Sequence, residues 1–123
     1  MNKKRRGVLE EMKGKVAMTR HDFAILRNSF SKRLEELNEF KREIEDLKNE
    51  EEQVIENTPL QFQDSDRFIE SEDAVAEMEI IEANFEVMTV ACKTVIKNID
   101  EMDALTALND VFISIRRILG EVR

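Results

Sequence analysis

The sequence predicts an all-α protein in which two long helices form an antiparallel coiled-coil hairpin, completed to a helical bundle by another chain. Three observations predict it. Apolar residues recur every 3.5 residues in two long blocks, 37% of the residues are charged, and turn-forming residues are scarce, with three glycines and one proline. This composition is typical of long helices, and this repeat is typical of coiled coils. The 123 residues fit one domain.

The first helix is predicted over about residues 3–57. Alternating steps of three and four residues from Leu9 to Val54 meet fourteen positions, of which eleven are apolar. We label Leu9 position a and Met12 position d of the heptad repeat. The e positions are mostly basic and the g positions mostly acidic, which favours one orientation of a partner helix.

The second helix is predicted over about residues 67–122. The same spacing runs from Ser71, a second a position, to Met102. Two consecutive steps of three then shift the apolar row to Leu105 and Leu108. The last turns are therefore expected to leave the two-stranded geometry.

The tip is predicted over about residues 58–66, around the only proline, Pro59. Thr58 and Gln61 have the spacing of a capping box, and the run 64–66, Asp-Ser-Asp, provides a second set of helix caps. A connection this short favours antiparallel neighbours. The competing interpretation is one kinked rod, both of whose seams are filled by other chains.

The register follows from the two apolar rows. If the numbers of facing residues add up to 125, Phe40 faces Phe85, and the polar Thr19 faces Thr106. The charged flanks then pair Lys41 with Glu82, Arg20 with Asp103 and Lys13 with Asp110. Such exposed ion pairs are worth only about 0.2–1 kcal/mol each, so they select a register rather than hold it. The predicted intramolecular seam consists of Phe23, Leu26, Phe30, Leu37, Phe40, Ile44, Met78, Ile81, Phe85, Met88, Val95 and Ile99.

The second helix has more large apolar residues than one seam can bury. An apolar patch of that size usually marks an interface. The competing interpretation is that the first helix breaks near Gly7 or Gly14 and folds back over the patch. Because the apolar row continues across Gly14, we expect a protein partner in a homo- or hetero-oligomer. The predicted partner interface consists of Ile80, Val87, Val90, Ile96, Val111, Ile113 and Ile118.

Charge is distributed unevenly, although the net charge is −8. Residues 1–34 carry ten Lys/Arg against three Asp/Glu, and residues 49–123 carry six against eighteen. The basic end, Lys3, Lys4, Arg5 and Arg6, is a candidate for binding nucleic acid, an anionic membrane or an acidic protein surface. The other interpretation is a solvated helix end.

The sequence contains no recognisable catalytic, cofactor or metal motif. His21 is expected at an exposed position without a second ligand nearby, and Cys92 is expected in the seam opposite Arg33. The phosphate-binding glycine motifs are absent. The acidic run 50–52 lacks the spacing of a calcium loop. We therefore expect a non-enzymatic protein with no cofactor, metal or small-molecule substrate.

The expected function is that of a structural or adaptor coiled-coil subunit, a scaffold in a multi-protein assembly. The alternative is a nucleic-acid or anionic-membrane surface binder that uses the basic N-terminal end. A weaker alternative is a small helical chaperone or regulator of a partner helix. The chain has one cysteine, no apolar run of membrane-spanning length and no signal-peptide pattern. These features predict an intracellular, cytoplasmic location, and a nuclear one is compatible.

Overall fold

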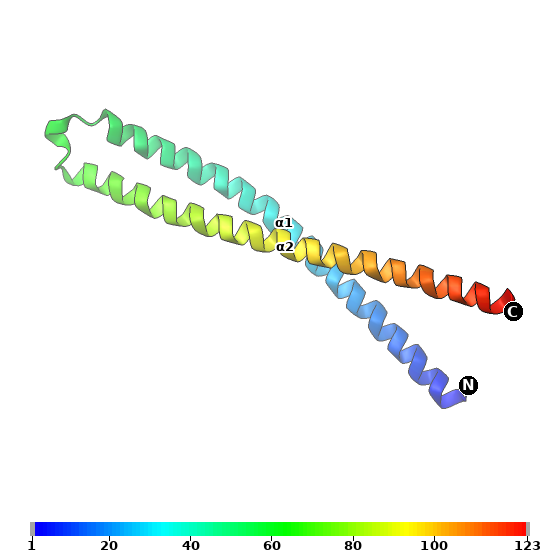
Figure 1. Ribbon diagram of the computed structural model, residues 1–123. Helices are drawn as coiled ribbons and strands as arrows, with labels where there is room; N and C mark the ends of the chain where they lie inside the picture. The colour runs from blue at the N-terminus through cyan, green and yellow to red at the C-terminus, as the bar shows by residue number, and fades with distance from the viewer. Residues whose placement is uncertain (1, 123) are drawn as a thin grey trace. The chain divides into compact units, whose positions relative to one another are not determined.

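The protein is an all-α hairpin, which confirms the predicted fold class. The computed structural model describes residues 2–122, with side chains described as far as residue 120. Helix α1 spans Lys3–Asn57, a 3-10 turn η1 spans Leu60–Phe62, and helix α2 spans Asp66–Val122 (Figure 1). The described residues contain no strand.

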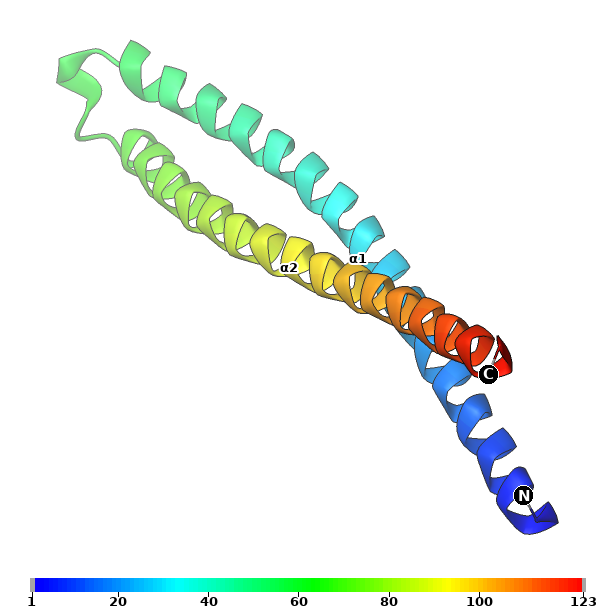
Figure 2. The same cartoon turned by 45° about the vertical axis from the view of Figure 1, so that its right-hand side comes forward.

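The chain forms two compact units, which we describe separately. The tip unit is Lys32–Lys93, and the terminal unit combines Met1–Ser31 with Thr94–Arg123. Each unit contains a stretch of α1 lying beside a stretch of α2 that runs the opposite way (Figure 2). Because the two helices pack on each other within one chain, the kinked-rod interpretation is wrong.

The register is visible in the tip unit. The rings of Phe40 and Phe85 stack with their centroids 6.2 Å apart and their planes at 27°. This is a pair that the predicted register places face to face. Aromatic pairs in this geometry stabilise a packed face beyond the area that they bury.

The packed face of α1 follows the a and e positions rather than a and d. The e residues Arg27, Lys41 and Lys48 are half-buried, whereas the d residues Leu26 and Leu47 are 42% and 49% exposed. Lysine and arginine can place their aliphatic stems in an interface and extend the charged group to its rim. Leu26 and Phe40, which were predicted in the two-helix seam, lie at its edge: they are 42% and 45% exposed, and Phe40 still stacks on Phe85.

Helix α2 is also rotated about its own axis, so that its a and e positions, rather than its a and d positions, face α1. Thr89, an e residue, is 4% exposed, whereas the preceding d residue Met88 is 43% exposed. Met88 is thus a second correction to the predicted seam. Ile96, which was predicted to face a partner, occupies an e position and is half-buried for the same reason.

The predicted ion pairs are wrong in detail. Long side chains on a helix lean toward its N-terminus, and in an antiparallel pair this moves the partner of a cation one or two turns further along the second helix. Lys13 pairs within its own helix, with Glu10. The pairs between α1 and α2 are Lys41 with Glu86, Lys48 with Glu82, Arg27 with Asp100 and Arg20 with Asp110.

Two of these pairs are hydrogen-bonded. Arg27 donates two hydrogen bonds to Asp100, and Lys41 donates one to Glu86. Both bonds lower the pKa of the accepting carboxyl. The ionised carboxylates of Asp100 and Glu86 therefore stabilise the fold fully at a pH above their ordinary pKa. This stabilisation is lost as the pH falls through their lowered pKa. The Lys48 ammonium lies 3.3 Å from Glu82 Oε1 but is not aligned for a hydrogen bond, so we describe this contact as an ion pair.

The two threonines that were predicted to face each other are satisfied within their own helices. The Thr19 hydroxyl donates to the Lys15 carbonyl, and the Thr106 hydroxyl donates to the Met102 carbonyl, both at 2.8 Å. Such bonds to the carbonyl four residues earlier are a common solution for threonine in a helix. Each hydroxyl therefore finds its partner in its own helix rather than across the pair.

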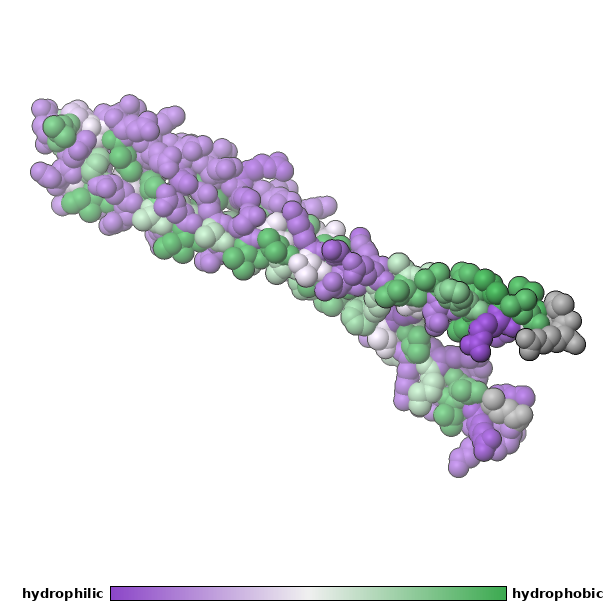
Figure 3. Space-filling model, viewed as in Figure 1, coloured by the Kyte–Doolittle hydropathy of each residue, from purple (hydrophilic) through white to green (hydrophobic). Residues whose placement is uncertain are grey.

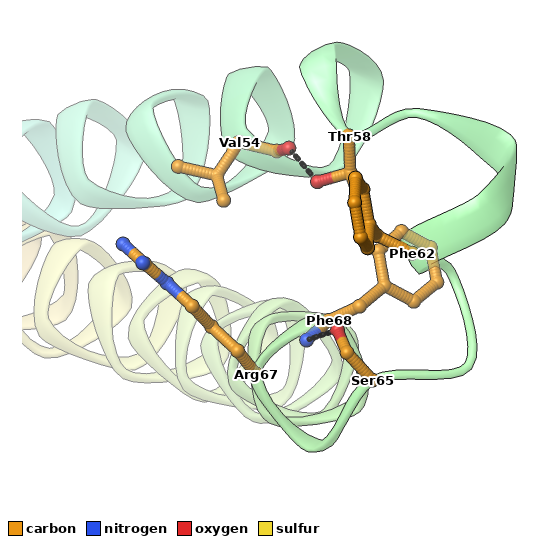
Figure 4. A pocket seen from close by; sticks show the side chains of 6 residues that line it. All are labelled: Val54, Thr58, Phe62, Ser65, Arg67 and Phe68. Atoms are coloured by element: carbon orange, nitrogen blue, oxygen red, sulfur yellow. Dashed lines mark hydrogen bonds between the residues drawn. The ribbon is translucent and has the colours of Figure 1, made fainter.

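The tip uses one of the two predicted caps. The Thr58 hydroxyl donates backward to the Val54 carbonyl at 2.6 Å, so it closes α1 and does not form the predicted capping box. Ser65 Oγ accepts a hydrogen bond from the Phe68 amide at 3.3 Å and caps α2, as predicted (Figure 4). The side chains of these four residues, with those of Phe62 and Arg67, line a hollow of about 340 Å³.

Thr89 provides a test of the packed face. Its hydroxyl is buried and has no hydrogen-bond partner among the described residues. Thr89→Val removes the hydroxyl at constant shape, so we expect it to raise the free energy of unfolding by about 1 kcal/mol. Urea titration followed by circular dichroism measures this. In the control Thr106→Val, where the hydroxyl is bonded, no gain is expected; an equal gain in both variants would contradict the role assigned to Thr89.

Candidate helix-packing interface

The hairpin buries little of its apolar surface. Only two apolar side chains in the described residues are buried, Cys92 and Ile99. By contrast, twenty-five large apolar side chains in the same part of the chain are exposed. Isolated exposed apolar residues are ordinary, but contiguous rows of them mark interaction surfaces. The arrangement of these residues is therefore the main evidence on function.

In each unit, the d positions of the two helices lie toward one side of the pair, which we call the d face. The d positions are exposed along α1, whereas on α2 up to Met102 only Met88 is exposed and the other four are half-buried. The two helices run antiparallel and are rotated in the same sense, so their d residues lie on the same side of the pair. In the tip unit the exposed residues of this face are Phe40, Leu47 and Val54 on α1 and Met88 on α2. Val87, which is 70% exposed, lies at its outer border on α2.

In the terminal unit, the d face contains a groove. A hollow of about 200 Å³ lies between Phe23 and Leu26 of α1 and four residues of α2: Val95, Asn98, Ile99 and Met102. A second hollow of about 490 Å³ also includes Asn98 and Met102 and continues to Leu105 and Asn109. Because d residues of both helices line the first hollow, the d face is shared by the two helices in this unit as well.

The helix ends of the terminal unit diverge from each other (Figures 1 and 2). Residues 3–22 of α1 and 107–120 of α2 are all exposed. The shift of the apolar row after Met102 explains the departure of α2, as the sequence predicted. Figure 3 shows a dense apolar surface on the last turns of α2. The large apolar residues exposed on these ends are Val8, Leu9, Met12, Val16 and Met18 on α1, and Leu108, Val111, Phe112, Ile113, Ile115, Ile118 and Leu119 on α2.

Six of the seven residues predicted for a partner interface are exposed, and Ile96 is the exception. Ile80 and Val87 border the d face, whereas Val90, Val111 and Ile118 lie at f positions, further round α2. The exposed d residues of the tip unit were missed because the sequence pattern assigned them to the seam. The basic e positions were the available signal, since their long side chains can pack their stems between the helices and still reach carboxylates of α2.

The basic end lies in the first turn of α1. Lys3, Lys4, Arg5 and Arg6 are exposed, and no ion pair forms to any of them among the described residues. The Asn2 side chain caps this turn by accepting a hydrogen bond of 2.8 Å from the Arg5 amide. The N-terminal end of a helix carries partial positive charge, so four cations there repel both one another and the helix dipole.

The histidine and the cysteine of the chain lie apart from any candidate ligand cluster in the described residues. His21 is exposed, and Cys92 is buried. The Arg33 side chain, opposite Cys92 in the predicted register, extends outward and donates a hydrogen bond to Glu36 at 2.8 Å. Among the residues that the structure describes, no group of three His, Cys, Asp or Glu side chains could hold a metal ion.

Neither helix has, within its described residues, a segment long and apolar enough to cross a membrane. Comparison with protein-family models, with curated proteins and with solved structures finds no significant match to this chain.

Proposed function

We propose that this chain is a non-enzymatic structural or adaptor subunit of a multi-chain assembly, in which other helices cover its exposed apolar faces. The observation that carries the proposal is the contrast between two buried and twenty-five exposed apolar side chains in the described residues. A small core stabilises a fold only weakly, and small helical proteins commonly add stability by association. An intracellular, cytoplasmic location is part of the proposal.

The geometry of the d face supports helix packing rather than chemistry. The hollow between the two helices is lined by five apolar side chains and the neutral amide of Asn98. The second hollow lies on α2 alone and is more polar, with Glu101, Thr106 and Asn109 beside Leu105. A groove between two helices, lined at heptad spacing, accommodates the apolar stripe of a further helix. The proposed assembly is accordingly a bundle of more than two helices.

The decisive experiment places two charges on the d face. Leu47→Glu with Val87→Glu should leave each helix intact and prevent its partners from packing, since an unpaired charge would be buried. In cell extract, we expect the wild-type chain to elute in a complex much larger than its 14.4 kDa mass, and the variant to elute close to that mass.

The matched control places the same two charges away from the d face. Asn49→Glu with Ala83→Glu changes two exposed f positions of the tip unit, and the complex should survive. Circular dichroism checks that both variants remain helical. A wild-type chain that elutes as the 14.4 kDa monomer in extract would refute the proposed function.

A second candidate function rests on the basic end. The four cations at the positive end of α1 would be stabilised by an anionic surface, either nucleic acid or membrane lipid. Tight binding of the wild type to DNA, RNA or anionic vesicles, abolished by Lys4→Glu with Arg6→Glu, would favour this function over assembly.

A further inference from the structure

The two units carry opposite charge. By sequence, the terminal unit has twelve Lys/Arg against eight Asp/Glu, a net charge of +4, and the tip unit has seven against nineteen, a net charge of −12. Both units expose apolar residues on the d face. Two units of opposite net charge that both expose apolar residues attract each other, whereas two copies of the same unit would repel each other.

Both ends of α1 carry charge of the unfavourable sign. The first turn has no acidic residue and the last turn has no basic one. The first turn instead contains Lys3–Arg6, Glu56 lies in the last turn, Glu50 lies about two turns before the end, and all of them are exposed. Because the helix dipole is positive at its start and negative at its end and acts mainly within one turn, Lys3–Arg6 and Glu56 are repelled by their own helix ends. Bringing the start of one α1 beside the end of another α1 would offset both repulsions.

We propose that the helices covering the d face are those of a second copy of this chain, lying antiparallel to the first. The terminal unit of each copy then packs on the tip unit of the other. The two contacts are identical by symmetry, as in most homodimers. The result is a four-helix bundle in which the basic start of each α1 meets the acidic end of the other. This inference rests on the proposed function and specifies its partner.

Two charge-reversal variants test the arrangement. The start variant is Lys4→Glu with Arg6→Glu, and the end variant is Glu50→Lys with Glu56→Lys. Both reversals improve the match between the side chains and the dipole of α1, so neither should weaken the helix. Each variant alone places like charges in both contacts of the dimer, and we expect its dissociation constant to rise about tenfold or more. Sedimentation equilibrium at low salt measures this.

The equimolar mixture of the two variants is the critical measurement. In the mixed dimer, the reversed start of one chain meets the reversed end of the other, and the two wild-type groups also meet. We therefore expect the mixture to dimerise with a dissociation constant within about threefold of the wild type. Circular dichroism of each variant checks that a loss of dimer is not a loss of helix.

Three results would overturn the inference, and they differ in what they imply for the proposed function. If neither variant alone dimerises more weakly than the wild type and the mixture dimerises more tightly than the wild type, the copies lie parallel, and assembly by helix packing still stands. If the purified wild type is monomeric at every concentration while the chain in extract is in a large complex, the partner is a different protein. If the chain is monomeric in both settings, the inference and the proposed function both fail.

Discussion

Replacing Ile99 by Asp is expected to lower the free energy of unfolding by about 4 kcal/mol, which is a large part of the stability of a small helical protein. Ile99 is the most buried apolar residue of the described chain, with 4% of its surface exposed. A carboxylate at this position would lie against Phe23, Leu26 and Val95 in the groove of the terminal unit. The nearby Arg27 is already bonded to Asp100 and cannot pair with it without losing that bond.

Ile113→Asp is the matched control. It makes the same change in the same helix, but at a residue that is 48% exposed. At low protein concentration we expect it to cost no more than about 1 kcal/mol, as is usual for surface positions. Urea titration followed by circular dichroism measures both variants. An equal loss in the two would mean that the burial of Ile99 does not stabilise the terminal unit.

A disulfide between positions 40 and 85 is expected to stabilise the hairpin by up to about 4 kcal/mol, because it closes a loop of about 45 residues. Phe40 and Phe85 point toward each other from the two helices of the tip unit. The variant carries Phe40→Cys and Phe85→Cys, with Cys92→Ala so that no other thiol is present. Urea titration before and after reduction gives the gain, and a non-reducing gel shows which chains are linked.

The control for the disulfide moves one cysteine to the outer face of α1. Arg42→Cys with Phe85→Cys places the first thiol at an exposed f position, where it should not react with position 85 of the same chain. If the 40–85 pair forms links only between chains, the packing of α1 on α2 described for the tip unit does not occur in solution.

The heptad spacing in the sequence was sufficient to predict both helices, the tip and the Phe40–Phe85 pair, because repeated spacing over many turns reports the helical period directly. The cap at Ser65 was also predictable, since short polar side chains before an apolar run are the usual helix caps. The divergence of α2 followed from the two consecutive steps of three after Met102.

The rotation of the helices was not predictable from the same pattern. The a/d rule assumes that each helix has one apolar neighbour, but the d residues Leu26, Leu47 and Met88 lie at the edge of the hairpin. Instead, the aliphatic stems of Lys41 and Lys48 pack between the helices. Whether a lysine can do this depends on the length of its side chain and on the direction in which the side chain points along the helix, and the heptad position alone does not report either. For the same reason Lys41 pairs with Glu86, one turn beyond the predicted partner Glu82.

The short connection at the tip has a consequence for synthesis on the ribosome. Helix α1, Lys3–Asn57, is complete before α2, Asp66–Val122, begins to emerge. At about 5–20 residues per second, the nascent α1 waits several seconds for its own partner. Closing the tip costs little entropy because the loop is short, so the residues nearest Ser65 meet first and the chain termini last. The basic, apolar start of α1 is therefore the segment that stays uncovered longest while the protein is being made.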